Sequence, residues 1–394
     1  MQLPCYNAGM ERIGIMVENS RAYGRAMIEG IAAFAQETHN WILRPLTVEE
    51  AFTPKLREFD GIIARIADDR LTERLVHSAL PTVDVFCQRV HPGIAGVDSD
   101  HASIGAMARN LFVSRGFQNL AFCGIPGVAF SDMRQKAFAD DKTFVFSLRT
   151  PHPTDESQFF AERLDRTPDA AQLRRWIRRL PRPIAVFCCN DLRAIQLQRI
   201  IRECGFRVPQ DFALLGVDND TIACSYAEIP ISSIDPNSFR VGFDAARILC
   251  AMLTRRPDAK PHPIHRVKPG DIIERTSSEF MPIDPPWLGT TLMHIERNLH
   301  RPIGAREIFH VAGRSSTHVE NVFHRRLGCS VQSYVNTKKL REAQRLLATT
   351  GQRISEIAFQ CGFASPQYFC RVFTTAYGIS PKAYRVRPAS GRSR

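Results

Sequence analysis

The sequence predicts an α/β body of two lobes, in which parallel sheets are flanked by helices, followed by an all-α domain with two helix-turn-helix units. Three observations lead to this fold class. Short apolar runs alternate with helix-like stretches over residues 11–282. The last hundred residues instead carry the same helix, glycine turn and helix pattern twice. The excess positive charge of the chain also falls in this last part.

The body is built from strand-like runs that are followed by helix-like stretches. Apolar runs of strand length cover Ile13–Val17, Gly61–Ala64, Thr82–Phe86, Leu120–Cys123, Phe144–Leu148, Ile184–Cys189 and Ala213–Val217. Helical periodicity covers Tyr23–Gln36, His101–Arg115, Ala170–Leu180, Leu192–Glu203 and Phe239–Leu253. This repeated order predicts parallel sheets, and the body is long enough for two lobes.

Polar residues follow several of the predicted strands, where parallel sheets bind their ligands. The segments are Glu18–Tyr23, Phe130–Arg134, Cys189–Asp191 and Gly216–Asp220. Carboxylates, an arginine and aromatic rings suit a polyhydroxylated ligand, because polar groups bind its hydroxyls while a ring packs on its apolar face. The competing interpretation is that Asp98, Asp191 and Asp218 cap helix N-termini.

The net charge of +12 is unevenly distributed along the chain. Residues 287–394 hold 17 Lys and Arg against 5 Asp and Glu, whereas the remaining residues hold 35 of each sign. A neutral body joined to a basic domain is typical of nucleic-acid binding. A membrane-surface patch and a disordered basic tail would also be basic, but the helical patterning of this region argues against both.

The second helix-turn-helix unit is predicted from residues 353–384. Its first helix is expected to bury Ile354, Ile357, Ala358 and Cys361, and its second helix Phe369, Val372, Phe373 and Ala376. Gly362 ends the first helix, and Ser365 caps the second with Pro366 at its first position. Gln367 and Arg371 then remain exposed, where they can reach base edges and phosphates.

The same pattern occurs about fifty residues earlier, around a turn at Gly313. Buried positions are Val319, Val322 and Phe323, and exposed positions are Thr317, His318, Glu320, Asn321, Arg325 and Arg326. Between the units a helix is predicted over Val331–Thr349, roughly 28 Å long at 1.5 Å per residue. Since major-groove faces recur about every 34 Å, one chain can place both second helices in successive major-groove segments.

These residues resemble the AraC-type DNA-binding domain. The resemblance rests on ISEIAFQCGFASPQYFCRVFTTAYGISPKAYR together with the preceding KKLREAQRLL. It implies DNA contacts from Thr317, Glu320 and Asn321 in the first unit, with Arg325 following them, and from Gln367 and Arg371 in the second. The first unit departs from the family pattern at Phe309 and Arg314.

The body resembles the periplasmic-binding-like sensor of LacI/GalR-type repressors. Matching segments are GVDSDHASIGAMARNLFVSRGFQNLAFCG, FCCNDLRAIQLQRIIRECGFRVPQDFALLGVDND and ISSIDPNSFRVGFDAARILCAML. Those repressors carry a helix-turn-helix ahead of the first strand. Here the first strand begins near residue 12, so the AraC-type domain at the other end takes its place.

This domain order resembles that of the XylR family of xylose-responsive activators. The resemblance implies a homodimer, a D-xylose effector that favours a DNA-bound activating form, and RNA polymerase as a further partner. It also implies that Asp191 and Asp218 hold sugar hydroxyls, with Arg134, Arg21 and Tyr23 nearby. Arg65 stands where the family has an acidic residue, so a different sugar or another small polar ligand remains the alternative.

The expected domains are a sensor over 11–282, a linker over 283–289 and a DNA-binding domain over 290–388. An enzyme is disfavoured because no GxGxxG, GxxxxGK[ST] or GxSxG motif occurs at a strand-to-helix turn. A transport protein is disfavoured by the missing export signal and the basic domain. Scattered cysteines without CxxC spacing predict a reduced, cytoplasmic protein without cofactor or metal, and no apolar run is long enough for a membrane span.

Overall fold

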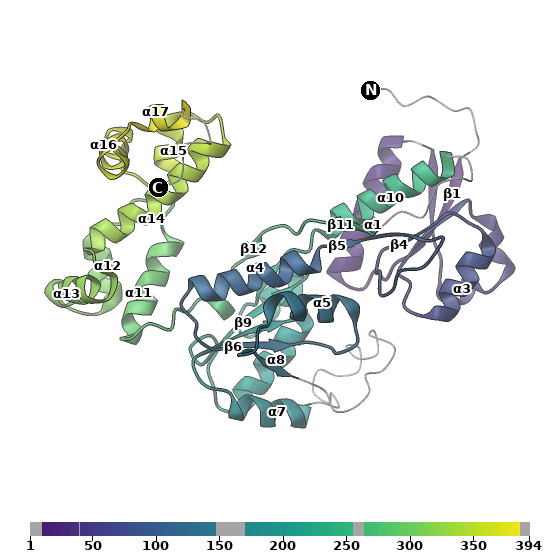
Figure 1. The fold of residues 1–394 in the computed structure, drawn as a ribbon, viewed down its shortest axis with the longest axis horizontal. Helices are drawn as coiled ribbons and strands as arrows, with labels where there is room; N and C mark the ends of the chain where they lie inside the picture. Colours follow the sequence, from purple (N-terminus) through teal and green to yellow (C-terminus); the bar gives the residue numbers. More distant parts are fainter. Residues whose placement is uncertain (1–9, 39, 147–169, 255–263, 387–394) are drawn as a thin grey trace. The chain divides into compact units, whose positions relative to one another are not determined.

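The computed structural model describes residues 10–38, 40–146, 170–254 and 264–386, and the chain forms two compact units, Met1–Glu279 and Phe280–Arg394 (Figure 1). The first unit contains two α/β lobes, each with its own sheet, and the second unit is helical. The predicted fold class is therefore confirmed. Within the described ranges, no helix is both long and apolar enough to cross a membrane.

The first lobe is a parallel sheet with the strand order β11-β5-β4-β3-β1-β2. Its strands are β1 (Glu11–Met16), β2 (Trp41–Pro45), β3 (Gly61–Ala64), β4 (Thr82–Asp84), β5 (Ala95–Ser99) and β11 (His265–Val267), and its helices are α1 (Ala22–Thr38), α2 (Val48–Ala51), α3 (Asp69–Ser78) and α10 (Ser238–Thr254). Helices α1 and α10 touch through their backbones, because a Cβ on Gly30 would lie 2.0 Å from Phe239 O. A larger residue at position 30 would push these helices apart.

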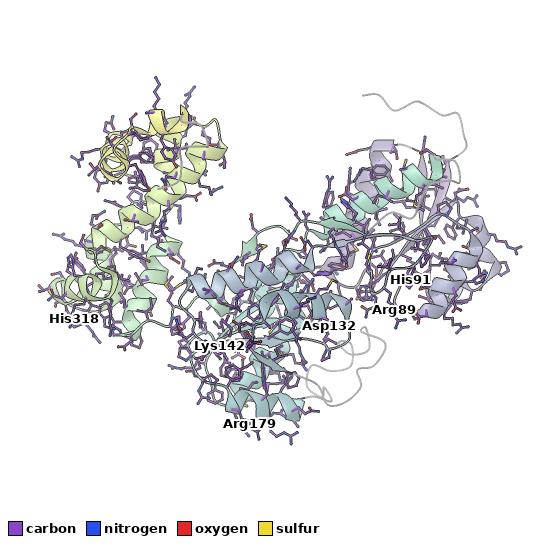
Figure 2. The ribbon with its side chains drawn as sticks, viewed as in Figure 1. Arg89, His91, Asp132, Lys142, Arg179 and His318 are labelled. Carbon is purple, nitrogen blue, oxygen red and sulfur yellow. The ribbon has the colours of Figure 1, made fainter. Side chains whose placement is uncertain are left out.

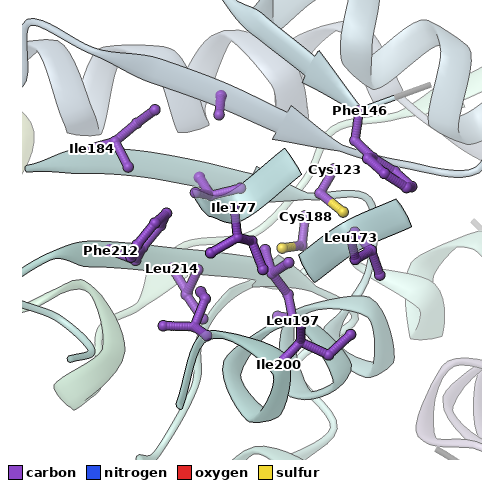
Figure 3. Packing of buried hydrophobic residues seen from close by; sticks show 14 of the residues in the cluster. Cys123, Phe146, Leu173, Ile177, Ile184, Cys188, Leu197, Ile200, Phe212 and Leu214 are labelled. Carbon is purple, nitrogen blue, oxygen red and sulfur yellow. The ribbon is translucent and has the colours of Figure 1, made fainter. Parts of the chain in front are cut away.

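The second lobe has the order β12-β10-β9-β8-β6-β7, with only β12 antiparallel to its neighbour. Its strands are β6 (Leu120–Cys123), β7 (Phe144–Phe146), β8 (Ile184–Cys188), β9 (Phe212–Val217), β10 (Ser232–Ile234) and β12 (Ile272–Ile273), and its helices are α4 (His101–Ser114), α5 (Ala129–Phe138), α7 (Ala170–Arg179), α8 (Asp191–Glu203) and α9 (Thr221–Tyr226). Figure 3 shows Ile177 of α7 and Leu197 of α8 packed onto this sheet. Both side chains are fully buried.

The predicted strand Thr82–Phe86 is shorter in the structure because Asp84 ends it. The buried Asp84 carboxylate accepts hydrogen bonds from the backbone N–H groups of Phe86 and Cys87, at 2.9 and 3.0 Å, which turns the chain out of the sheet. Burial of this carboxyl raises its pKa to about 6. The last two residues of the predicted strand Phe144–Leu148 lie outside the described residues.

The strand order of each sheet contains one switch point. The order reverses between β1 and β3 in the first sheet and between β6 and β8 in the second. In open α/β sheets, ligands bind beyond the carboxyl ends of the strands at such switch points. The segments predicted to bind a ligand follow β1, β6, β8 and β9, so the topology places them at these ends.

The second unit consists of α11 (Pro286–Arg297), α12 (Ala305–Ala312), α13 (Ser316–Leu327), α14 (Val331–Thr349), α15 (Ile354–Gln360), α16 (Pro366–Tyr377) and α17 (Pro381–Val386). It has two hydrophobic cores, and α14 contributes Val331 and Val335 to the first and Leu340 and Leu346 to the second. Helix α14 thus connects two packed halves, each with one helix-turn-helix unit.

The expected linker over 283–289 overlaps the structure of the second unit. Helix α11 begins at Pro286, and Leu288 is fully buried in the first core of this unit. Residues 286–289 are therefore part of a packed helix. The last two residues of the expected DNA-binding domain, 387 and 388, lie outside the described residues.

Candidate DNA-binding surface and effector site

Both helix-turn-helix units turn at a glycine and restart at a capping serine. Gly313 and Gly362 have φ angles of 59° and 70°, in the left-handed region that favours glycine. Ser315 Oγ accepts from His318 N–H at 3.4 Å, and Ser365 Oγ from Tyr368 N–H at 3.2 Å. These local features fix where α13 and α16 begin, and Ser365 is the cap that the sequence predicted for α16.

The inner faces of both second helices are largely as predicted. Val319, Val322 and Phe323 are buried in α13, and Phe369 and Phe373 are fully buried in α16. The expectation that Ala376 is buried is wrong, since it is exposed. The stripe continues four residues after Phe373 to Tyr377 instead, with the two ring centres 4.7 Å apart.

The outer faces carry the side chains that were expected to contact DNA. On α13, Thr317, Asn321 and Arg325 are exposed, and Figure 2 shows His318 on the same helix. On α16, Gln367 and Arg371 are exposed. The Arg371 guanidinium lies 5.4 Å from the centre of the Tyr368 ring, which orients it at the surface of α16.

Glu320 has a different position from the other expected contacts. It is half-buried, and its carboxylate accepts from Val331 N–H at 3.1 Å, at the first residue of α14. A carboxylate at this place stabilises the N-terminus of α14. Glu320 therefore joins the first recognition helix to the helix that connects the two halves.

All five acidic residues between 287 and 394 are engaged in contacts within the second unit. Three form ion pairs: Glu296 with Lys338, Glu307 with Arg301 and Glu342 with Arg345. The other two accept from backbone N–H groups: Glu320 from Val331 and Glu356 from Arg353. Hydrogen bonds from Arg301 and His294 lower the pKa of Glu307 to about 2. Arg326 of α13 pairs with Asp284 at 3.1 Å, so Arg325 of α13 and Arg371 of α16 are the arginines that remain to attract phosphates.

In the first unit, Tyr23 is the point where the expected ligand residues meet. It is the second residue of α1, and the charges of Asp98, Asp218, Arg134 and Arg65 all act on its hydroxyl. Burial is the main cause that raises the Tyr23 pKa, with the two carboxylates next, so the phenol stays neutral. The structure therefore brings Tyr23, Arg134 and Asp218 into one site, and Arg21 lies just before α1.

Arg134 is a buried arginine on α5 that faces the β8 end of its own lobe. It is 2% exposed, and Nη1 donates to the carbonyl of Cys189. Its guanidinium lies 4.9 Å from the centre of the Phe130 ring. Among the described residues, its Nε–H has no hydrogen-bond acceptor. A buried donor of this kind is costly unless a ligand satisfies it.

A group that the sequence analysis missed lies beside Arg134. The Asp98 carboxylate accepts from Arg266 at 2.9 Å and from His101 Nε2 at 3.1 Å. Asp98 and His101 are both buried, with 1% and 2% of their surface exposed. Burial, followed by the charge of Arg134, lowers the His101 pKa, so this imidazole is neutral. Its Nδ1 is then an acceptor, and no described residue donates to it.

The capping interpretation of Asp98 is wrong. Helix α4 is capped by Asp100, whose carboxylate accepts from Ser103 N–H at 3.0 Å. Asp98 instead holds a histidine and an arginine that comes from β11, far along the sequence. Sequence spacing contained no signal for this arginine.

Asp218 ends β9 in a strained backbone conformation. Its φ angle is 110° and that of Asn219 is 48°, both positive in residues other than glycine. Such conformations cost about 1–3 kcal/mol each and gather at functional sites. The strain supports the expectation that Asp218 serves a ligand rather than only the fold.

Asp191 lies deeper than a ligand residue was expected to lie. It is 1% exposed, and its Oδ2 accepts from Asp220 N–H at 2.9 Å, which ties the β8 end to the β9 end. Burial raises its pKa to about 7. The carboxylate also packs on Gly216, where a Cβ would lie 2.2 Å from Oδ1. The cap of α8 is Asn190, which is 4% exposed and which the sequence analysis did not select.

Arg65 and two aromatic rings complete the site. The Arg65 guanidinium lies 3.7 Å from the centre of the Phe86 ring, and the rings of Phe86 and Phe130 are 6.4 Å apart. Stacking fixes the position of Arg65 at the end of β3. The site thus combines flat apolar surface with charged groups of both signs, which is the chemistry of a sugar site.

The chain matches two protein families. Residues 109–278 match the periplasmic binding protein-like domain, and residues 309–387 match a helix-turn-helix domain. These ranges fall in the first and the second compact unit respectively. The two families are those of a ligand-binding module and a DNA-binding module, and neither makes the chain an enzyme.

Similar proteins share both modules in the same order. The xylose operon regulatory protein of Escherichia coli K12 is 24% identical, over 95% of this chain and 96% of its own length. That of Haemophilus influenzae is 23% identical, over 95% of this chain and 98% of its own length. The solved structure of the xylose-binding transcription activator XylR has a TM-score of 0.58 at 23% identity, over 95% of this chain and 98% of that one.

The similarity to these regulatory proteins extends over both units. The exposed faces of the recognition helices α13 and α16 and the positive charge of the second unit are consistent with DNA binding. The chain is therefore a DNA-binding transcription regulator, in which a periplasmic binding protein-like domain precedes a helix-turn-helix domain as in the xylose operon regulatory proteins.

Proposed function

We propose that the chain binds an operator with the exposed faces of α13 and α16, and that a sugar bound in its first unit controls this binding. The proposed DNA contacts are Thr317, Asn321, Arg325, Gln367 and Arg371, whereas Glu320, inside α13, acts indirectly by accepting from Val331 N–H at the start of α14. The observation that carries the proposal is the second unit, with two capped recognition helices on a basic surface.

The effector site is proposed at Tyr23, Arg134 and Asp218, with Arg21 at its edge. Asp191 stabilises this site by accepting from Asp220 N–H. Arg134 Nε–H is a buried donor and His101 Nδ1 a buried acceptor, both without partners among the described residues. A hydroxyl group both donates and accepts, so it satisfies such a pair, whereas a carboxylate only accepts. This chemistry favours a neutral polyol over an anion.

A pentose is the proposed effector, and D-xylose is the first candidate because the relatives are named for xylose. Arg65 beside Phe86 gives this site a cation at its edge, and a charge at that place changes which hydroxyl pattern fits. Another sugar or a small polar ligand is the alternative. The ligand controls DNA binding only if it binds one arrangement of the protein more tightly than the other.

The regulator is proposed to work as a cytoplasmic activator that contacts RNA polymerase, and as a homodimer. An exposed apolar patch supports the dimer, since Tyr226 and Ile222 of α9 are 91% and 72% exposed. Beside them a groove of about 520 Å³ is lined by Ile195, Gln198 and Ala227. A protruding ring next to a groove is self-complementary, because a two-fold axis lets each copy fill the groove of the other.

Charges around the groove fit the same arrangement. Its rim carries Arg199 and Arg202 together with Glu203 and Glu228. Within the chain they pair as Arg199 with Glu203 and Arg202 with Glu228, so the rim has no net charge that would repel a second copy. The occupant proposed for this groove is therefore a second copy of the chain.

Replacing Tyr226 with glutamate is expected to shift the protein from dimer to monomer. Burial of a large aromatic side chain contributes about 1.5–3 kcal/mol, so its loss weakens the dimer at least about tenfold. Sedimentation velocity of the full chain over a concentration series measures this change. Val90→Glu is the control, because Val90 is 77% exposed but lies outside the groove. A dimer that tolerates Tyr226→Glu as well as Val90→Glu would remove this face from the interface.

The experiment that tests the proposed function uses the full chain and duplexes selected from random DNA. Binding is expected to fall steeply with salt, because the arginines displace counterions from phosphates. D-xylose, L-arabinose, D-ribose and D-glucose are then screened by thermal shift, since a ligand of the folded state raises its melting temperature. The sugar that does so is expected to change the DNA affinity. Selection that enriches no sequence would overturn the proposal.

Arg371→Ala is expected to weaken operator binding by about 1–3 kcal/mol while the sugar-induced thermal shift stays the same. If Arg371 contacts a base, the variant no longer distinguishes the bases at one operator position. If it contacts a phosphate, the slope of log affinity against log salt concentration falls by about one. Arg345→Ala is the matched control, because Arg345 is exposed on α14 and paired with Glu342. Equal affinities for the two variants would exclude Arg371 as a contact.

A further inference from the structure

A buried lysine lies where the two halves of the second unit meet. Lys339 is near the middle of α14, between Val335 of the first core and Leu340 of the second. It is 4% exposed. Lysine is almost never buried to this degree unless its ammonium is paired, so the contacts of this group are informative.

The ammonium bridges backbone from both halves. Lys339 Nζ donates to Arg301 O at 2.9 Å, in the loop between α11 and α12, and to the carbonyl of Gly362, in the turn between α15 and α16. The Phe363 ring centre lies 5.7 Å away. Lys339 of α14 thus contacts two further segments, the α11–α12 loop through Arg301 and the α15–α16 turn through Gly362 and Phe363.

The two loops that Lys339 joins also touch each other. A Cβ on Gly362 would lie 2.2 Å from Leu299 O and 2.5 Å from Arg301 O. The turn of the second helix-turn-helix unit therefore rests directly on the α11–α12 loop of the first half. Helix α16 follows this turn directly, and the loop leads into α12, which shares a core with α13. The junction therefore sets the position of one recognition helix relative to the other.

The junction binds a cation without a carboxylate. Arg301, which lies beside Lys339, pairs with Glu307, and Lys338 pairs with Glu296 at 2.6 Å. Burial, with a smaller contribution from the Arg301 charge, lowers the Lys339 pKa to about 8. A leucine or methionine would avoid this cost, but it would leave the carbonyls of Arg301 and Gly362 without the donor that joins them.

We infer that Lys339 is a positioning residue for DNA binding, which holds α13 and α16 at one separation and one rotation so that both recognise a single operator spacing. The inference rests on the proposed role of these two helices in DNA contact. It goes beyond that role because Lys339 itself faces the protein interior and touches no DNA.

Rigidity at this junction has a measurable consequence for affinity. When two linked modules are held in the geometry of their target, the second contact forms at a high effective concentration. A loosened junction lowers that concentration without changing either recognition helix. Lys339 variants are therefore expected to lose affinity for the complete operator while they keep their affinity for each half.

The test compares Lys339→Met and Lys339→Arg with wild type in the full chain. The probes are the operator selected by wild type, two versions with one half scrambled, and a version with five base pairs inserted between the halves. Five inserted base pairs rotate the second half of the operator by about half a helical turn, so the affinity of wild type for this probe is expected to fall roughly 100-fold. Lys339→Met is expected to bind the complete operator roughly tenfold more weakly than wild type does. The five-base-pair insertion is expected to reduce the affinity of this variant by a smaller factor than it reduces that of wild type.

Two comparisons separate positioning from folding. Lys339→Arg keeps a cation with several donors and is expected to restore most of the spacing dependence. Lys338→Met is the matched control, since Lys338 is the adjacent residue and its partner Glu296 lies in the first half alone. Lys339→Met that loses half-site and complete-site affinity equally, or that keeps the spacing dependence of wild type, would overturn the inference. Wild type indifferent to scrambling of either half would instead contradict the proposed function.

Discussion

Replacing Gly362 with alanine is expected to destabilise the second unit by about 3 kcal/mol or more, and with it to abolish DNA binding. Two costs add. The φ angle of 70° is unfavourable for alanine, and the new methyl group would lie 2.2 Å from Leu299 O and 2.6 Å from Arg301 N. Backbone atoms on both sides leave the methyl no flexible neighbour to displace. Hydrogen–deuterium exchange of α14–α16 peptides in the full chain measures the loss locally.

Gly378→Ala is the matched control for this prediction. Gly378 ends α16 with a φ angle of 72°, but a Cβ there meets nothing within 4 Å. This variant therefore carries only the backbone cost, about 1 kcal/mol. Equal exchange rates in the two variants would show that the close approach of Gly362 to the Leu299–Arg301 loop does not stabilise the unit.

Residues close in sequence carried the predictions that succeeded. Helix α14 was expected over Val331–Thr349 and has these bounds, because apolar spacing is a local signal. The start of α16 at Pro366, after the cap Ser365, was also predicted from neighbouring residues. Five short strands, β2, β5, β10, β11 and β12, were not predicted. Strands of two to five residues have too few positions to show a period, and pairing with neighbouring strands creates them.

The effector site was predicted less well because it depends on contacts between distant residues. Arg266 reaches Asp98 only because β11 pairs with β5 at the edge of the first sheet. His101 was overlooked because it opens a helix, and its contact with Asp98 depends on how that helix leaves β5. Asp191 was selected for its place after a strand, yet Asp220 and Gly216 enclose it. Sequence order placed these residues after strands but did not indicate the depth of each side chain.

The arrangement of Arg134 predicts a variant that separates the two functions of the chain. Arg134→Met keeps most of the side-chain volume and removes the guanidinium. Sugar binding is expected to weaken by about 3 kcal/mol, roughly 100-fold, because hydrogen bonds from a buried charge to the ligand are lost. Calorimetric titration with D-xylose, or with the sugar that raises the melting temperature of wild type, measures the effect. Operator binding without sugar is expected to persist, since the second unit forms a separate core.

Arg89→Met controls for the loss of an arginine from the first unit. Arg89, labelled in Figure 2, is exposed and pairs with Asp69 at 2.5 Å on the surface, so little change in sugar affinity is expected. Arg134 also supports the carbonyl of Cys189, and part of its effect could therefore come from the fold. Arg134→Lys distinguishes these roles, because a lysine can still reach a carbonyl but cannot supply the directed Nε–H that His101 Nδ1 complements. Sugar affinity restored to the wild-type value by lysine would mean that the site uses a positive charge rather than the buried donor of Arg134 and the buried acceptor of His101.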